Sequence, residues 1–251
     1  MVNGLDSFIS QFRDFSDCYT VIGGAACDIL MTEAGLKLRA TKDVDMLLIL
    51  EAQDRFTEFA EQLWEYIRQG GYTYGWKNSD EVHFYRFTNP SRPGYPVQLE
   101  LFSRMPGYHL EAPAEIIPIH IDDQVSSLSA ILLDDEYYNF MRQGRKQERG
   151  VTVLGPEYLI PFKMYAWLNL TQQKTQGRHV NEKDLRKHKL DVFRLLQIIP
   201  ASSRINVSEG IRQHIAQFLT AMEQEEIALN QIQIPIRKGD ALEILRNIYL
   251  H

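Results

Sequence analysis

Apolar residues in the first part of the chain change between two kinds of spacing. They recur every three to four positions over residues 5–16, 25–35 and 54–69, which predicts amphipathic helices. Shorter apolar or alternating runs bounded by Gly, Pro and Asn predict strands. These runs lie at 19–22, 43–50, 72–76, 82–88, 97–102, 116–121 and 130–133. We therefore predict an α+β fold in which helices flank a mixed sheet.

After Gly155-Pro156 the pattern is helical only. Proline is common at the start of a helix, and Pro200 fits a position just beyond a helix end. The spacing predicts helices at roughly 156–173, 182–198, 208–229 and 238–249. We expect two domains, a sheet domain over residues 1–155 and a C-terminal helical bundle over residues 156–251.

The composition is that of an ordinary globular protein, with 44% hydrophobic and 24% charged residues. This excludes a fibrous repeat, a wholly disordered chain and a disulfide mini-protein. No apolar run approaches the roughly 18 residues of a membrane span, and no secretory signal is visible. We therefore expect a cytoplasmic protein that does not bind membranes, with Cys18 and Cys27 as reduced thiols.

Charge is distributed unevenly along the chain. The net charge is −6, yet residues 141–190 hold 11 of the 27 Lys and Arg and only four of the 33 Asp and Glu. A basic segment on an acidic protein can bind phosphate groups locally. A solvated helical face with surplus lysines explains the same count, and composition does not decide between the two.

Two aspartates begin a predicted strand. Asp43 and Asp45 are two positions apart, so their carboxylates share one face of the strand, about 6.5–7 Å apart. Carboxylates placed together repel each other unless a cation lies between them. Oxygen ligands of this kind favour Mg²⁺ or Mn²⁺. The plainer alternative is an exposed strand edge or cap.

Glu100 is the candidate third acid. It points away from Val97, Leu99 and Leu101 in its strand, and an acid within an apolar strand is costly unless it is paired or binds a cation. If this strand lies beside the Asp43 strand, Glu100 joins the aspartates. A buried ion pair with a lysine is the alternative.

Gly23-Gly24 joins a predicted strand to a predicted helix. Glycines allow the backbone to approach a ligand closely, and the N–H groups that begin the helix are ready to bind phosphate. Taken alone, the pair is more simply explained as a plain tight turn. The order strand, Gly-Gly, helix and Asp-x-Asp strand is more specific than any of its parts.

This order resembles the nucleotidyltransferases of the DNA polymerase β superfamily, and more closely their AbiEii/AbiGii-type toxins. The run from Arg39 to Asp45, RATKDVD, looks like that family's Arg-x-Ser/Thr-x-Asp-x-Asp. In the helical half, 160–166 looks like its lysine helix and 187–191 like its final Lys-x-x-x-Asp element. The resemblance covers most of residues 19–196 and says nothing about 200–251.

The resemblance implies an Mg²⁺-dependent enzyme that takes a nucleoside triphosphate (NTP) as substrate. Asp43, Asp45 and Glu100 would hold the metal, and Glu100 would also serve as a base. Gly23 and Gly24 would approach the triphosphate.

The remaining positions carry further implied roles. Lys163 and Lys187 would contact phosphates, Asp191 would orient Lys187 or the acceptor, and Arg39 and Thr41 would complete the nucleotide site. Without the resemblance, the two lysines are equally well explained as cations that cap helix ends or pair with acids. An RNA end or a protein would be the acceptor, and an antitoxin protein would restrain the activity.

The chain departs from the family pattern at two places. Gly23-Gly24 is followed by Ala25-Ala26, where members often carry a hydroxyl, and His188 stands where an acid is common. Two rival functions therefore remain: a nucleotide- or partner-binding module that has lost turnover, and a small-molecule nucleotidyltransferase of the aminoglycoside-modifying kind. The absence of HExxH, G-x-S-x-G and GxxxxGK[ST] motifs argues against zinc hydrolases, serine hydrolases and P-loop NTPases.

Overall fold

The computed structural model describes residues 3–37, 41–49, 53–78, 83–103, 131 and 134–251. The predicted strand at 116–121 and the candidate Arg39 lie outside these residues. The chain divides into two compact units, Met1–Val125 with Arg145–Leu154, and Ser126–Gly144 with Gly155–His251. This division differs from the expected one because residues 126–144 belong to the second unit and not to the sheet unit.

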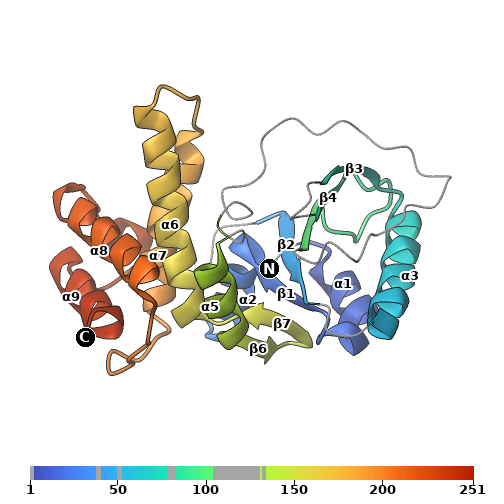
Figure 1. Ribbon diagram of the computed structural model, residues 1–251, viewed down its shortest axis with the longest axis horizontal. Helices are drawn as coiled ribbons and strands as arrows, with labels where there is room; N and C mark the ends of the chain where they lie inside the picture. Colours follow the sequence, from blue (N-terminus) through green and yellow to red (C-terminus); the bar gives the residue numbers. More distant parts are fainter. Residues whose placement is uncertain (1–2, 38–40, 50–52, 79–82, 104–130, 132–133) are drawn as a thin grey trace. The chain divides into compact units, whose positions relative to one another are not determined.

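The first unit is built on a mixed sheet, shown in Figure 1. Its described strands are β1 (Tyr19–Ile22), β2 (Asp43–Leu48), β3 (Thr73–Asn78), β4 (His83–Thr88), β5 (Gln98–Ser103), β6 (Arg145–Glu148) and β7 (Val151–Leu154). They follow the order β3-β4-β5-β2-β1-β7-β6. The β2–β5 and β1–β7 pairs are parallel and the other pairs are antiparallel. The predicted α+β class is confirmed.

Helices of this unit bury aromatic residues against the sheet. They are α1 (Leu5–Phe12), the short η1 (Arg13–Phe15), α2 (Gly23–Glu33) and α3 (Gln53–Gly70). The Phe8 ring meets the Tyr19 ring of β1 edge to face at 5.5 Å, and Phe12 lies 5.6 Å from Phe59 of α3. The helical spacing of these residues in the sequence therefore does mark the buried faces.

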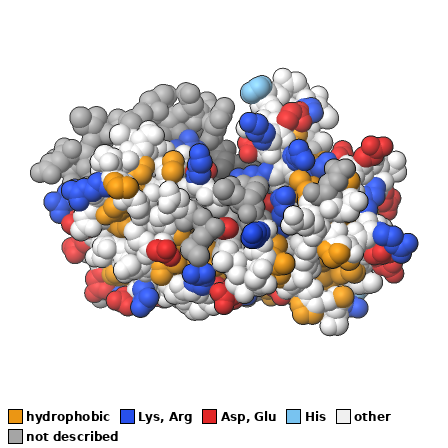
Figure 2. All heavy atoms as spheres, turned by 180° about the vertical axis from the view of Figure 1, so that it is seen from behind, with side chains coloured by type: hydrophobic (Ala, Val, Ile, Leu, Met, Phe, Trp, Pro, Cys, Tyr) orange, Lys and Arg blue, Asp and Glu red, His pale blue; other side chains and the backbone are white. Residues whose placement is uncertain are grey.

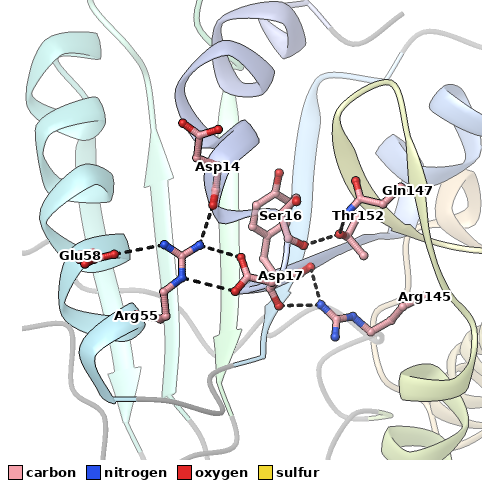
Figure 3. Close-up of polar contacts among 9 residues, drawn as sticks. Asp14, Ser16, Asp17, Arg55, Glu58, Arg145, Gln147 and Thr152 are labelled. Carbon is pink, nitrogen blue, oxygen red and sulfur yellow. Dashed lines mark hydrogen bonds and ion pairs between the residues drawn. The ribbon is translucent and has the colours of Figure 1, made fainter.

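The β6–β7 hairpin was not predicted from the sequence. Strand β6 reads RKQE, without apolar alternation, and the turn residues Arg149 and Gly150 both have positive φ. Arg145 holds the hairpin to β1, because its guanidinium donates to Thr20 Oγ1 at 2.9 Å. It also donates to the Asp17 carbonyl at 2.7 Å (Figure 3).

Residues 14–17, which precede β1, also contact α3. Arg55 donates to the Asp17 carboxylate at 2.8 Å and to the Asp14 carbonyl at 2.6 Å (Figure 3). This pairing lowers the pKa of Asp17. Residues 14–17 thus tie α3 and the hairpin to the N-terminal end of β1, the end opposite Gly23.

The second unit is helical, as predicted. Its described helices are α5 (Asp135–Gln143), α6 (Pro156–Thr175), α7 (Glu182–Leu196), α8 (Glu209–Gln224), η2 (Leu229–Ile232) and α9 (Lys238–Tyr249). Helix α6 packs on α7 and α8, and α8 packs on α9 (Figure 1). No helix in the described part of the chain combines the length and apolar character needed to cross a membrane.

Helix α5 explains why residues 134–144 join the helical unit. The Asp134 carboxylate caps α5 by accepting hydrogen bonds from the Glu136 and Tyr137 amides. The Tyr137 ring packs edge to face on Phe162 of α6 at 5.0 Å. Within the predicted 130–133 strand, the described residue Ile131 is helical, so that prediction was wrong there.

Candidate functional site

The pairing of β2 with β5 brings two of the predicted acids directly together. In this parallel register Asp45 lies opposite Glu100 and Asp43 lies opposite Gln98. Residues two apart on a strand share a face, so all three acids project from one face of the sheet. Glu100 is only 3% exposed, whereas Asp43 and Asp45 are half-buried.

Gly23 lets the carboxylate of Asp45 approach the start of α2. Ile22 of β1 lies opposite Asp45, and α2 begins at the next residue. Gly23 has a φ of +66°, and a Cβ placed there would lie 2.1 Å from Asp45 Oδ2. Any other residue would be strained and would clash with this oxygen. The N–H groups that begin α2 therefore lie beside a carboxylate.

Gly24 and Thr41 are buried in the same unit. Gly24 directly follows Gly23 in the first turn of α2. Thr41, 7% exposed, comes two residues before Asp43, the first residue of β2. Gly24 is thus next to Gly23, and Thr41 is close in sequence to Asp43. Their assignment to a nucleotide site stays a prediction.

Arg86 of β4 is a site residue that the sequence analysis missed. It lies opposite Glu100 in the antiparallel β4–β5 register, and its Nε donates to Glu100 Oε1 at 2.7 Å. Gln98 Nε2 donates to the same oxygen at 2.8 Å. The alternative of a paired Glu100 is thus realised, with an arginine in place of a lysine. The available signal was the position of Arg86 between the buried Tyr85 and Phe87, which points it away from their face.

Burial raises the pKa of Glu100 to about 8. The carboxylate of Asp45 and its hydrogen bond add to the rise, while the charge and hydrogen bond of Arg86 oppose it. The contact with Arg86 therefore does not offset the cost of placing Glu100 in a buried position beside a second carboxylate.

The chemistry of these donors fits a hard divalent cation. Carboxylate oxygens are the preferred protein ligands of Mg²⁺, and a bound cation would favour the ionised form of Glu100 over the protonated form. However, the described residues contain no group of three or more His, Cys, Asp or Glu arranged to hold a metal ion. The two-acid pair is in place, and the three-ligand site stays a prediction.

Lys163 and Asp191 form a buried ion pair in the second unit. Lys163 Nζ lies 3.3 Å from Asp191 Oδ2, and both side chains are 0% exposed. Arg194 Nη1 lies 3.2 Å from the other Asp191 oxygen. This arrangement agrees with the alternative in which Lys163 pairs with an acid. Lys187, half-buried on α7, belongs to the same unit, and the phosphate roles of both lysines stay predictions.

The basic segment 141–190 is shared between the two units and is partly neutralised. Lys174 pairs with Glu182, and Lys189 pairs with Glu225. Figure 2 shows exposed acidic side chains interspersed with basic ones. The local excess of lysine and arginine in the sequence therefore does not translate directly into free positive charge.

Comparisons with known proteins add little to this geometry. Neither a protein-family model nor a curated protein matches the chain. Among solved structures, the chain is similar to an antigenic nucleotidyltransferase-like protein from Paracoccidioides brasiliensis, with 17% sequence identity and a TM-score of 0.45. The similarity covers 98% of this chain and 94% of that one. A likeness of this strength says nothing about activity.

Proposed function

We propose that the protein is an Mg²⁺-dependent nucleotidyltransferase that moves a nucleoside monophosphate from an NTP to an acceptor hydroxyl. The observation that carries this proposal is the β2–β5 register, which sets Glu100 opposite Asp45 beside the start of α2. Acids on one sheet face next to a helix N-terminus offer a cation site and a phosphate site side by side.

Each residue has a definite task in this proposal. Asp43, Asp45 and Glu100 would hold the metal, which supplies neutralisation of phosphate charge when bound. The N–H groups at the start of α2 donate to phosphate oxygens, and Gly23 and Gly24 keep that approach free of side chains. Catalysis of phosphoryl transfer rests mainly on positioning and on charge stabilisation, and these groups provide both.

Transfer of label from radioactive NTPs, measured with Mg²⁺ and with Mn²⁺, tests the proposal. We expect Asp45→Asn to reduce transfer at least about 100-fold, because it removes a charge on which the cation site depends. Asp6→Asn is the matched control, since Asp6 is an exposed acid on α1 of the same unit. Equal labelling by the wild type and Asp45→Asn would contradict the proposal.

The identity of the acceptor and the biological role rest on the family resemblance alone. We propose an RNA end or a protein as the acceptor, and growth inhibition restrained by an antitoxin. Expression in a bacterial host, with and without the neighbouring gene, tests the toxin role. Loss of toxicity in Asp45→Asn links it to the chemistry, whereas unchanged growth on expression of the wild type argues against a toxin.

A binding module without turnover is the second candidate. The contact of Arg86 with Glu100 favours it, because this ion pair occupies one of the predicted metal ligands. The Gly23-Gly24-Ala25-Ala26 sequence, which offers no hydroxyl, points the same way. NTP binding without pyrophosphate release, across RNA, protein and aminoglycoside acceptors, would favour this candidate. It would argue against the enzyme that modifies RNA or protein and against an aminoglycoside-modifying nucleotidyltransferase.

A further inference from the structure

The second unit contains a cavity that the proposed chemistry does not use. It has a volume of about 700 Å³ and is lined by one face of α6, one face of α7 and the segment that follows α8. This volume lies within the roughly 300–1,000 Å³ of small-molecule sites, and the space between helices of a bundle is a common place for them. All the lining residues belong to the helical unit, so the cavity is separate from the acids of the sheet.

The floor of the cavity is apolar. Trp167 of α6 contributes to it, and its indole is fixed edge to face on the ring of Phe218 at 5.4 Å. The other apolar lining residues are Leu185, Leu190, Ile227 and Ile232. An aromatic ring or a short hydrocarbon chain would bury its surface against these side chains.

The rim of the cavity carries charges, most of which neutralise each other. Lys174 pairs with Glu182 at one place and Lys189 pairs with Glu225 at another. Arg186 lies on the same face of α7, between the positions of Glu182 and Lys189. Within the described residues Arg186 is exposed and makes no ion pair, so its guanidinium is available to a ligand.

The charge balance limits the kind of ligand. Arginine binds carboxylate and similar anionic groups through two parallel hydrogen bonds. A triphosphate or a nucleic acid would meet the carboxylates of Glu182, Glu225 and Glu226 as well, and these would repel several negative charges. A single negative charge beside Arg186 avoids most of that repulsion.

We propose that this cavity binds a small organic monoanion whose apolar ring or chain rests on the Trp167 floor and whose anionic group pairs with Arg186. This ligand class differs from the nucleotide of the proposed reaction. The proposal therefore stands or falls independently of the acidic site.

Two fluorescent probes with similar rings separate the two parts of the proposal. Anilinonaphthalene sulfonate carries one negative charge, and N-phenylnaphthylamine carries none. We expect the full-length wild type to bind both, and Arg186→Gln to weaken sulfonate binding about tenfold while leaving the neutral probe unchanged. Arg178→Gln is the matched control, because Arg178 is an exposed arginine of the same unit that does not line the cavity.

Further variants locate the probes and keep the test decisive. Thr171→Trp fills the cavity from α6 and Ala228→Trp fills it from the facing segment, so each variant that retains the wild-type melting temperature should lose both probes. Glu226→Gln should tighten sulfonate binding about two- to threefold, because it removes a like charge. The proposal is overturned if the wild type binds neither probe, if Arg186→Gln and Arg178→Gln weaken the sulfonate equally, or if folded filling variants still bind both.

Discussion

Two buried clusters of ionisable side chains, one on the sheet and one between helices, balance charge differently. On the sheet, the buried Glu100 faces a second carboxylate, Asp45, and pairs with Arg86. Between α6 and α7, the buried Asp191 has both Lys163 and Arg194 as partners. The first cluster sets two carboxyl groups against one guanidinium, whereas the second sets one carboxylate against two cations.

This difference in balance separates a candidate ligand site from a structural contact. Two neighbouring buried carboxyl groups ionise together only at a cost in free energy, and a cation bound at the sheet would lower that cost. The buried Asp191 carboxylate already has two cationic partners. The comparison therefore favours Asp45 and Glu100 as the place of the chemistry. The contact of Lys163 with Asp191 joins α6 to α7, and the predicted functional roles of these two residues stay predictions.

The largest expected effect is on the buried pair Lys163 and Asp191. Asp191→Leu should lower the free energy of unfolding by about 3–5 kcal/mol, because it leaves the fully buried Lys163 without this carboxylate. Lys163→Met should cost less, since Asp191 keeps the contact with Arg194. Urea denaturation measures both variants.

Two controls sharpen this prediction. The double variant Lys163→Met/Asp191→Leu should recover much of the lost stability, because it replaces the ion pair by an apolar contact. Asp240→Asn, which removes an exposed partner of Arg237, should change stability by less than about 1 kcal/mol. Equal small losses in all four variants would show that the buried pair does not stabilise the helical unit.

A smaller effect is expected at Gly23, which leaves room for the Asp45 carboxylate because it has no side chain. Gly23→Ala should cost about 1–3 kcal/mol, because it combines a positive φ with a Cβ that lies 2.1 Å from Asp45 Oδ2. It should also abolish nucleotide transfer by displacing that carboxylate. Gly177→Ala is the control, since Gly177 also has a positive φ but has open space around its Cβ. Equal losses of stability in the two variants would show that the clash with Asp45 does not matter.

The unbalanced cluster should make stability depend on pH. The pKa of Glu100 is about 8 in the folded protein and near its ordinary value of 4.5 in the unfolded chain. The folded state therefore binds the Glu100 proton more tightly than the unfolded chain does. This proton stabilises the fold fully below about pH 4.5, and the stabilisation is lost as the pH rises through 8. We expect a loss of roughly 1–2 kcal/mol between pH 6.5 and 8 in a chelating buffer.

Glu100→Gln tests this pH dependence directly. Because glutamine does not titrate, the variant should lose less stability than the wild type over the same pH range. Urea midpoints at several pH values measure it. An identical decline in both proteins would mean that another group causes the change.

The smallest expected effect is that of added metal. Millimolar Mg²⁺ should raise the melting temperature of the wild type by a few degrees, because a ligand that binds only the folded state stabilises it. Asp45→Asn should show a smaller rise, and Lys163→Met should respond like the wild type. The same rise in the wild type and in Asp45→Asn would contradict the binding of Mg²⁺ by Asp45 and Glu100.

Sequence reasoning was reliable wherever the signal was local. The period of two in β2 correctly placed Asp43 and Asp45 on one face, and helical spacing found α1, α3 and the four long helices of the second unit. It failed for β6, whose RKQE sequence has no apolar alternation and which is held in place by the long-range contact of Arg145 with Thr20. It also failed at Arg86, whose role depends on a register between β4 and β5 that no local pattern reveals.

The sequence by itself determined the types and approximate limits of most elements and the presence of an acidic strand after a Gly-Gly turn, because periodicity and turn chemistry are local properties of the chain. Only the tertiary structure decided which charges meet. Strand order and register joined Glu100 to Asp45 and Arg86, and the packing of α6 on α7 joined Lys163 to Asp191. Charge balance depends on neighbours that are far apart in sequence, so it emerges only when the chain is folded.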